Sequence, residues 1–310
     1  MKRLIFMAGV AAAVMSCGKA EVLELPDSAV VFENVFVSNL TRADLSINSL
    51  ESFTVFGRSS GNEVLFDDTK VSRVEGEWLY SGTHSWDRSS AHSFAAYAPC
   101  EASDAIYNLD YQYGEGALTF DYDSDADHQH DLLVADAFYS GTSSSVSMDF
   151  RHMLSILSFV FTSEEPRELT FNINSVKVNG VYTKAHFNGT CFEDLSAPEA
   201  YPVLPQGAYT CTEGQSLTAE EIYVIPQAQT SGAVSVELDL TATDSLGNVL
   251  TYNDAMTVEL PEFDWRAGKT YEINIALEAN DVNPEIKVSK IEFSVSVEGW
   301  KEITSSNQVN

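Results

Sequence analysis

Apolar and polar residues alternate along most of this chain with the two-residue period of a β-strand. Residues 271–277 show the pattern most clearly, because every second side chain there is large and apolar. Residues 234–241 and 291–298 repeat it. Each of these segments is expected to form a strand with one face on a core and the other face toward solvent.

Short apolar segments separated by polar turns extend this pattern over the rest of the chain. They predict further strands at residues 29–37, 53–57, 78–80, 93–98, 118–120, 131–135, 146–155, 169–178, 181–187 and 222–225. The spacing of these segments predicts an all-β fold made of β-sandwiches. A length of 310 residues is enough for two such domains in tandem.

Two segments carry a more specific expectation. Residues 29–37 are apolar on both faces, which predicts a strand buried on two sides. One face would carry Val31, Val35 and Val37, and the other Val30, Phe32 and Phe36. The pair Asn179-Gly180 predicts a hairpin turn, because both residues tolerate positive φ. A second pair, Asn188-Gly189, ends the strand that follows.

The N-terminus resembles a lipoprotein signal. A basic start precedes an apolar stretch, Leu4–Val14, which is too short to span a bilayer as a stable helix. A small residue then stands directly before Cys17, as in a lipobox. We expect residues 1–16 to be removed, Cys17 to be acylated on its sulfur, and residues 17–28 to form a polar tether to the membrane. The alternative is an ordinary signal peptide followed by a chance cysteine.

The chain is strongly acidic, with 46 acidic and 17 basic residues and a formal net charge of −29. Such a surface repels phosphate backbones, which argues against nucleic acid as a partner. Export permits disulfides, and one between Cys191 and Cys211 would close a loop of about twenty residues. The open alternative is that Cys191 and Cys211 are free thiols, because this pairing would leave Cys100 without a partner.

The sequence offers little catalytic or metal-binding chemistry. Carboxylates occupy every second position of residues 121–127, as in a calcium loop, but Ala126 and Leu132 stand where an EF-hand needs glycine and glutamate. A solvated acidic loop without a metal is therefore expected. The sequence contains no Gly-x-Ser-x-Gly elbow, no glycine-rich phosphate loop and no Cys-x-x-Cys pair. We accordingly expect neither an enzyme nor a cofactor.

Aromatic residues gather in two places and leave a rival function open. The two groups are Trp78, Tyr80 and Trp86, and Tyr107, Tyr111 and Tyr113. Exposed aromatic rings bind sugars by stacking, which would make the chain a monomeric glycan-binding surface lipoprotein. The simpler explanation is packing within a β-sheet core, where tyrosine and tryptophan are ordinary residues.

Several motifs occur in an order that resembles the fimbrillin family, whose members are surface lipoproteins that build fimbriae in certain Gram-negative bacteria. The order of the motifs, rather than any one of them, carries the resemblance, and it spans nearly the whole chain. The motifs are the lipobox at Cys17, Arg42-Ala43, Tyr97-Ala98-Pro99, the region of Asp131 and His152, Pro226-Gln227, the entry Trp265-x-Ala267-Gly268-Lys269-x-Tyr271, and the final Gly299-Trp300.

The resemblance implies two β-sandwich domains of transthyretin-like topology behind a lipidated N-terminus on the outer membrane. By position, the first would span residues 29–150 and the second residues 151–310. It also implies proteolytic cleavage between Arg42 and Ala43, which would remove the strand at residues 29–37. A strand from another subunit would then fill the open groove, so that the polymer is held by β-strand addition.

The partners implied are other fimbrial subunits, outer-membrane lipid through Cys17, and a ligand on a host or bacterial surface. A stalk, tip or anchor role remains open. The reason is that residues 301–310 are largely polar, whereas a donor strand should carry alternating apolar residues.

Overall fold

The described part of the chain is mostly β-strand, as the alternation predicts, and its one helical element is the short 3-10 helix η1 (Cys100–Asp104). The structure is a computed structural model. It describes residues 29–37, 50–87, 89–111, 113–114, 118–143, 145–163, 170–203, 209–212, 216–219, 221–251, 256–277 and 293–299. Over these residues there is no helix long and apolar enough to cross a membrane.

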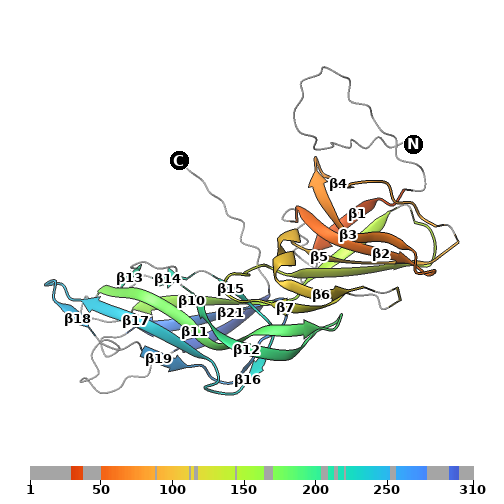
Figure 1. Cartoon of the computed structure of the whole chain (residues 1–310). Helices are drawn as coiled ribbons and strands as arrows, with labels where there is room; N and C mark the ends of the chain where they lie inside the picture. Colours follow the sequence, from red (N-terminus) through yellow and green to blue (C-terminus); the bar gives the residue numbers. More distant parts are fainter. Residues whose placement is uncertain are drawn as a thin grey trace.

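Seven strands of the first half close into a barrel in the order β1–β4–β3–β2–β5–β8–β9. Figure 1 labels β1 to β5 of this barrel. The strands are β1 (Phe32–Val37), β2 (Ser52–Ser59), β3 (Val64–Val74), β4 (Glu77–Tyr80), β5 (His92–Ala98), β8 (Leu133–Tyr139) and β9 (Val146–His152). β1 closes the ring, because it pairs in parallel with β9 and antiparallel with β4. This first unit is therefore a closed barrel, where the sequence had predicted a sandwich.

Two sheets make up the second half. One contains β10 (Ser155–Ser163), β14 (Ser216–Thr218), β15 (Ile222–Val224), β21 (Lys269–Leu277) and β22 (Phe293–Gly299). The other contains β6 (Ile106–Asp110), β7 (Thr119–Asp123), β11 (Thr170–Phe187), β12 (Phe192–Pro202), β13 (Tyr209–Thr212), β17 (Ser235–Thr243), β18 (Val249–Thr251) and β19 (Met256–Glu259). A short pair joins β16 (Ala228–Gln229) to β20 (Phe263–Asp264).

Three apolar cores hold these sheets together. The first fills the barrel, and the second lies between the two sheets of the second half, where Phe159 of β10 and Ile273 of β21 share a cluster with Phe171 of β11. The third joins the halves, because it combines Tyr97 of the barrel with Phe187 of β11. Every residue of β5 is buried for this reason: one of its faces points into the barrel and the other into the joining core.

The predicted alternation is confirmed in the strands that form the second core. In β21, Tyr271, Ile273, Ile275 and Leu277 are buried, and the residues between them are half-buried. β17 shows the same period. β22 pairs antiparallel with β21 from Lys269↔Gly299 to Ile275↔Phe293, so the predicted second strand of this hairpin is also confirmed.

The predicted hairpin at Asn179-Gly180 is wrong, because the pair lies inside the single long strand β11. The pairing with β12 shifts register there, so the pair forms a β-bulge. Gly180 has φ +85°, and a Cβ on it would lie 2.3 Å from the carbonyl oxygen of Ala233. The turn instead lies at Asn188-Gly189, in the connection between β11 and β12.

Gln227 supports β11 beyond this bulge. Its side-chain oxygen accepts a hydrogen bond from the backbone N–H of Tyr182 at 3.1 Å, and its amide donates to the carbonyl oxygens of Ile225 at 3.0 Å and Tyr182 at 3.4 Å. The side chain is buried, so it satisfies backbone groups that water cannot reach. The motif Pro226-Gln227 thus has a structural role at a sheet junction.

The division of the chain near residue 150 stays a prediction. The chain does pass from the barrel to the other sheets between β9 and β10. However, β6 and β7 come from the first half of the sequence and extend the sheet of the second half, through the pairing of β7 with β11 (Figure 1). One hairpin of the first half is therefore built into the second.

Candidate functional site

β1 closes the barrel through unequal contacts with its two neighbours. It pairs with β9 at Phe32↔Val146, Val35↔Met148, Phe36↔Asp149 and Val37↔Phe150, but with β4 only at Phe32↔Trp78. Most of its backbone pairing is therefore with one strand. Loss of β1 would open the barrel between β4 and β9 and leave β9 as an unpaired edge.

A bulge turns the apolar side chains of β1 toward one side. Asn34 has φ +51°, and the register with β9 shifts between Phe32 and Val35. Phe32, Val35 and Val37 are consequently all buried in the barrel core, whereas Phe36 is only half-buried. The prediction of equal burial on two faces is therefore wrong, because the extra residue of the bulge changes the phase of the alternation.

Phe32 is the centre of the contact between β1 and the barrel. Its ring lies edge-on to Phe53 at 5.4 Å, Phe66 at 5.5 Å, Tyr80 at 6.0 Å and Phe94 at 6.5 Å, measured between ring centroids. Edge-to-face geometry at these separations is favourable for aromatic pairs. The strand therefore fills an aromatic groove that the rest of the barrel provides.

The segment before β1 is fixed by backbone hydrogen bonds. Val30 N donates to the carbonyl oxygen of His84 at 2.8 Å, and Val146 N donates to that of Val31 at 2.7 Å. The hydroxyl of Tyr80 donates to the carbonyl oxygen of Val30 at 2.6 Å. Burial raises the pKa of Tyr80, so this donor keeps its proton over the physiological range.

Four buried side chains give the scale of this contact: Val30, Phe32, Val35 and Val37. Burial of one such side chain is worth about 1.5–3 kcal/mol, so the four together contribute roughly 6–12 kcal/mol. A whole domain is stable by only about 5–15 kcal/mol. The barrel therefore needs a strand in this groove, whichever chain supplies it.

Three of the residues singled out in the sequence lie outside the described residues. These are the lipidation residue Cys17 and the processing residues Arg42 and Ala43.

The disulfide between Cys191 and Cys211 is not formed, and both residues carry thiols. Cys211 is buried in β13, opposite Phe171 at the start of β11. Cys191 is exposed in the turn after Phe187, at the far end of β11. A strand of that length separates the two sulfurs by roughly 50 Å, whereas the Cα atoms of a disulfide lie within about 7 Å.

Most of the aromatic residues considered for sugar stacking belong to the core. Trp78, Trp86 and Tyr111 are buried, and the first two pack inside the barrel. A glycan-binding surface at Trp78 and Trp86 is therefore wrong. Tyr107 differs, because 48% of its surface is exposed.

The acidic segment after residue 120 is partly a strand. Asp121 and Asp123 lie on β7 and face basic side chains of β11 in register, at His186 and Lys184. Asp121 Oδ1 lies 2.8 Å from His186 Nδ1, and Asp123 Oδ2 lies 2.8 Å from Lys184 Nζ. Only the residues after Asp123 form a loop. Across the described ranges, no group of three or more His, Cys, Asp and Glu residues is suited to hold a metal ion.

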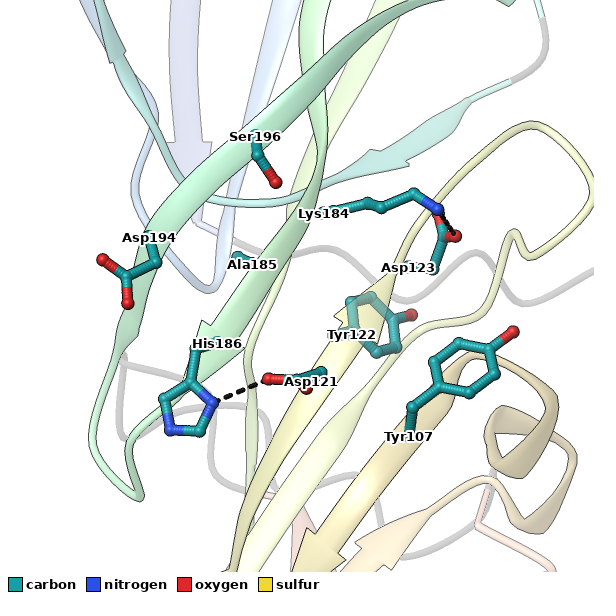
Figure 2. Close-up of a pocket in the computed structure, with 9 residues that line it drawn as sticks. All are labelled: Tyr107, Asp121, Tyr122, Asp123, Lys184, Ala185, His186, Asp194 and Ser196. Atoms are coloured by element: carbon teal, nitrogen blue, oxygen red, sulfur yellow. Dashed lines mark hydrogen bonds and ion pairs between the residues drawn. The ribbon is translucent and has the colours of Figure 1, made fainter.

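A surface pocket of about 550 Å³ lies over these pairs. Its lining comes from four adjacent strands, β6, β7, β11 and β12: Tyr107, Asp121, Tyr122, Asp123, Lys184, Ala185, His186, Asp194 and Ser196 (Figure 2). Hydrogen bonds from Asn108 and His186 lower the pKa of Asp121. The hydrogen bond and charge of Asp123 raise the pKa of Lys184. The ionised forms of Asp121 and Lys184 are thus favoured along this face.

The sequence analysis missed this pocket. The sequence did contain a signal for it. Residues 121–123 carry acidic side chains at alternate positions, and residues 184–186 carry basic side chains at alternate positions. The two segments are about sixty residues apart, and only the pairing of β7 with β11 brings them together.

Comparison with known proteins places these features in a family. The family model described as fimbrillin-like matches residues 41–300. The chain belongs to the fimbrillin-like family. The resemblance noted in the sequence is therefore confirmed. A comparison with curated proteins gives no match for this fimbrillin-like chain.

Solved structures share the fold of this fimbrillin-like protein at low sequence identity. A fimbrial protein from Bacteroides vulgatus matches with a TM-score of 0.60 and 15% identity, over 88% of this chain and 100% of that one. A candidate cell adhesion protein from Bacteroides ovatus matches with a TM-score of 0.55 and 14% identity, over 90% and 99%. At such identities the matches support the fold alone, and they cover the relatives almost completely.

Proposed function

We propose that this protein is a structural subunit of cell-surface fimbriae, in a stalk, tip or anchor position, and that it supports adhesion. It is exported as a lipoprotein, with the acylated Cys17 in the outer membrane. Two transthyretin-like β domains, divided near residue 150, follow the lipidated tether. Membership of the fimbrillin-like family supports this assignment.

Subunits join by β-strand exchange in this proposal. A protease cuts between Arg42 and Ala43, β1 leaves the barrel, and a strand from another subunit takes its place. The observation that carries the proposal is the position of β1 as the closing strand of the barrel, held mainly by β9. Its departure would expose both an aromatic groove and an unpaired strand edge, and an incoming strand satisfies both at once.

Limited treatment of the purified protein with an arginine-specific protease tests the proposal. Intact mass and size-exclusion elution are recorded for the wild type and for Arg42→Ala. We expect a cut after Arg42 and growth into SDS-resistant oligomers, neither of which Arg42→Ala allows. A wild-type protein that stays monomeric after a clean cut would refute strand exchange as its mode of assembly.

A further inference from the structure

The pocket on the outward face of β6, β7, β11 and β12 has no role in closing the barrel, and its side chains lie in two rows across the strands. One row runs from Tyr107 through Asp121 to His186, and the other from Asp123 through Lys184 to Ser196. Adjacent strands are about 4.8 Å apart, so the pocket spans roughly 14 Å across the sheet. This leaves room for more than one sugar ring side by side.

Bulges at both sides of the pocket shape its outer strands. Asn108 of β6 has φ +50° and Asp194 of β12 has φ +54°, and the pairing of each strand with its neighbour shifts register there. A bulge changes the direction in which side chains point. Positive φ in a residue other than glycine is often found at functional sites. In this sheet they bring Asp194 into the lining and place the amide of Asn108 2.6 Å from Asp121 Oδ2.

Two buried polar atoms of the lining residues, Tyr122 Oη and Asp123 Oδ1, have no hydrogen-bond partner among the described residues. Asp123 is only 8% exposed, and its Oδ2 is used by Lys184. Its Oδ1 is buried and accepts no hydrogen bond from any residue that the structure describes. A ligand group that donates a hydrogen bond can share Oδ2 with Lys184, because each carboxylate oxygen has two lone pairs.

Tyr107 supplies the apolar part of the site. Its ring is half exposed, and within the described part of the chain no other aromatic ring packs against it. Figure 2 places it on the β6 side of the pocket, opposite Asp194 and Ser196 on β12. An exposed aromatic face beside paired charges is a surface on which one side of a ligand can stack while its other groups form hydrogen bonds.

We propose that this pocket binds a neutral saccharide, with one sugar ring stacked on Tyr107 and neighbouring hydroxyls held between Asp123 and Lys184. A hydroxyl can donate to Asp123 Oδ2, since a carboxylate oxygen accepts more than one hydrogen bond, and can accept from the ammonium of Lys184. A pair of adjacent hydroxyls therefore fits the two groups together. Both Asp121 and Asp123 already face a basic partner, which favours a neutral ligand over a cation. The site is separate from the strand-exchange groove and does not depend on assembly.

The test uses the full chain on an array of immobilised neutral oligosaccharides, followed by titration with the strongest ligand found. We expect binding, and we expect Tyr107→Ala to weaken it about three- to tenfold, as lost aromatic stacking does. Phe138→Ala is the matched control, because Phe138 is an exposed aromatic residue of the barrel outside the pocket and its removal should leave binding unchanged. Unfolding temperature confirms that each variant is folded.

A second variant separates a neutral ligand from a cationic one. Asp194→Asn keeps the shape of the side chain and one acceptor oxygen but removes the charge, and asparagine tolerates the positive φ at this position. A saccharide should lose little affinity. The proposal is overturned if no oligosaccharide binds, if Tyr107→Ala binds as well as the wild type, or if an oligolysine peptide binds instead and Asp194→Asn abolishes that binding.

Discussion

Phe32→Ala measures how much β1 contributes to the barrel. The Phe32 side chain is 1% exposed and contacts four aromatic rings edge-on. Phe→Ala changes at buried sites cost about 3–5 kcal/mol, from lost burial and from the cavity that remains. We expect the upper part of this range, because the rings around Phe32 belong to the rigid barrel wall and cannot easily collapse into the space.

The assay is urea unfolding followed by tryptophan fluorescence, since Trp78 and Trp86 lie in the same core. Both proteins carry Arg42→Ala, so that β1 stays attached throughout. Phe36→Ala is the control: Phe36 is on the same strand but only half-buried, and its loss should cost less than half as much. A cost below about 1 kcal/mol for Phe32→Ala would mean that the side chain is not buried as described.

Three further changes test other parts of the structure. Gly180→Ala should destabilise the protein by about 2–4 kcal/mol, because φ is positive and the new Cβ has no space; Gly141→Ala, with open space around it, should be nearly neutral in the same unfolding assay. Gln227→Ala should cost about 1–3 kcal/mol in urea unfolding, because it leaves buried backbone groups unpaired. Hydrogen bonds from Ser90 and Ser89 lower the pKa of Asp87 from 3.8 to about 2. The ionised form is thus favoured by folding, so Asp87 stabilises the protein above about pH 4 and loses this effect as the pH falls toward 2. The difference in unfolding temperature between wild type and Asp87→Asn should accordingly shrink as the pH falls from 4 toward 2, and a difference that grew on acidification would contradict the assignment.

Strands in which apolar and polar residues alternate regularly were predictable, because this local pattern alone indicates which face of the strand is buried. In β21 the apolar residues stand at every second position and all of them are buried. β12 and β3 were not predicted, because β12 is mostly half-buried or exposed and β3 carries exposed polar residues along much of its length. Their positions are set by pairing with β11 and β2, which no local pattern reveals.

The bulges explain why two local predictions failed. Asn179-Gly180 has the composition of a hairpin turn, but the same positive φ at Gly180 also suits a bulge within a strand. In β1, the extra residue at Asn34 brings Phe32 and Val35 to the same face. A two-residue period cannot reveal an inserted residue, and the composition of a pair cannot distinguish a turn from a bulge. Both errors therefore come from local patterns interpreted without knowledge of the partner strand.

Of the two candidate sites, one was partly recognisable from the sequence and the other was not. The apolar strand before Arg42 was recognisable from its composition, but its place between β4 and β9 was not, because that depends on pairing with strands distant in the sequence. The pocket at Tyr107 depends on a strand order that joins β6 and β7 to β11, across the middle of the sequence. Long-range pairing of this kind cannot be derived from residue spacing.

A reversible lock on β1 tests the central claim most directly. Phe36 and Asp149 are partners in the parallel pairing of β1 with β9 on the outer side of the barrel, and partner residues in neighbouring strands are close enough for a disulfide. The double variant Phe36→Cys/Asp149→Cys is oxidised, cut with the arginine-specific protease, and followed by size exclusion before and after reduction. Strand exchange predicts that the cut, oxidised protein stays monomeric and assembles once the disulfide is reduced. Equal assembly of the oxidised and reduced forms would show that β1 need not leave the barrel, and would contradict the account.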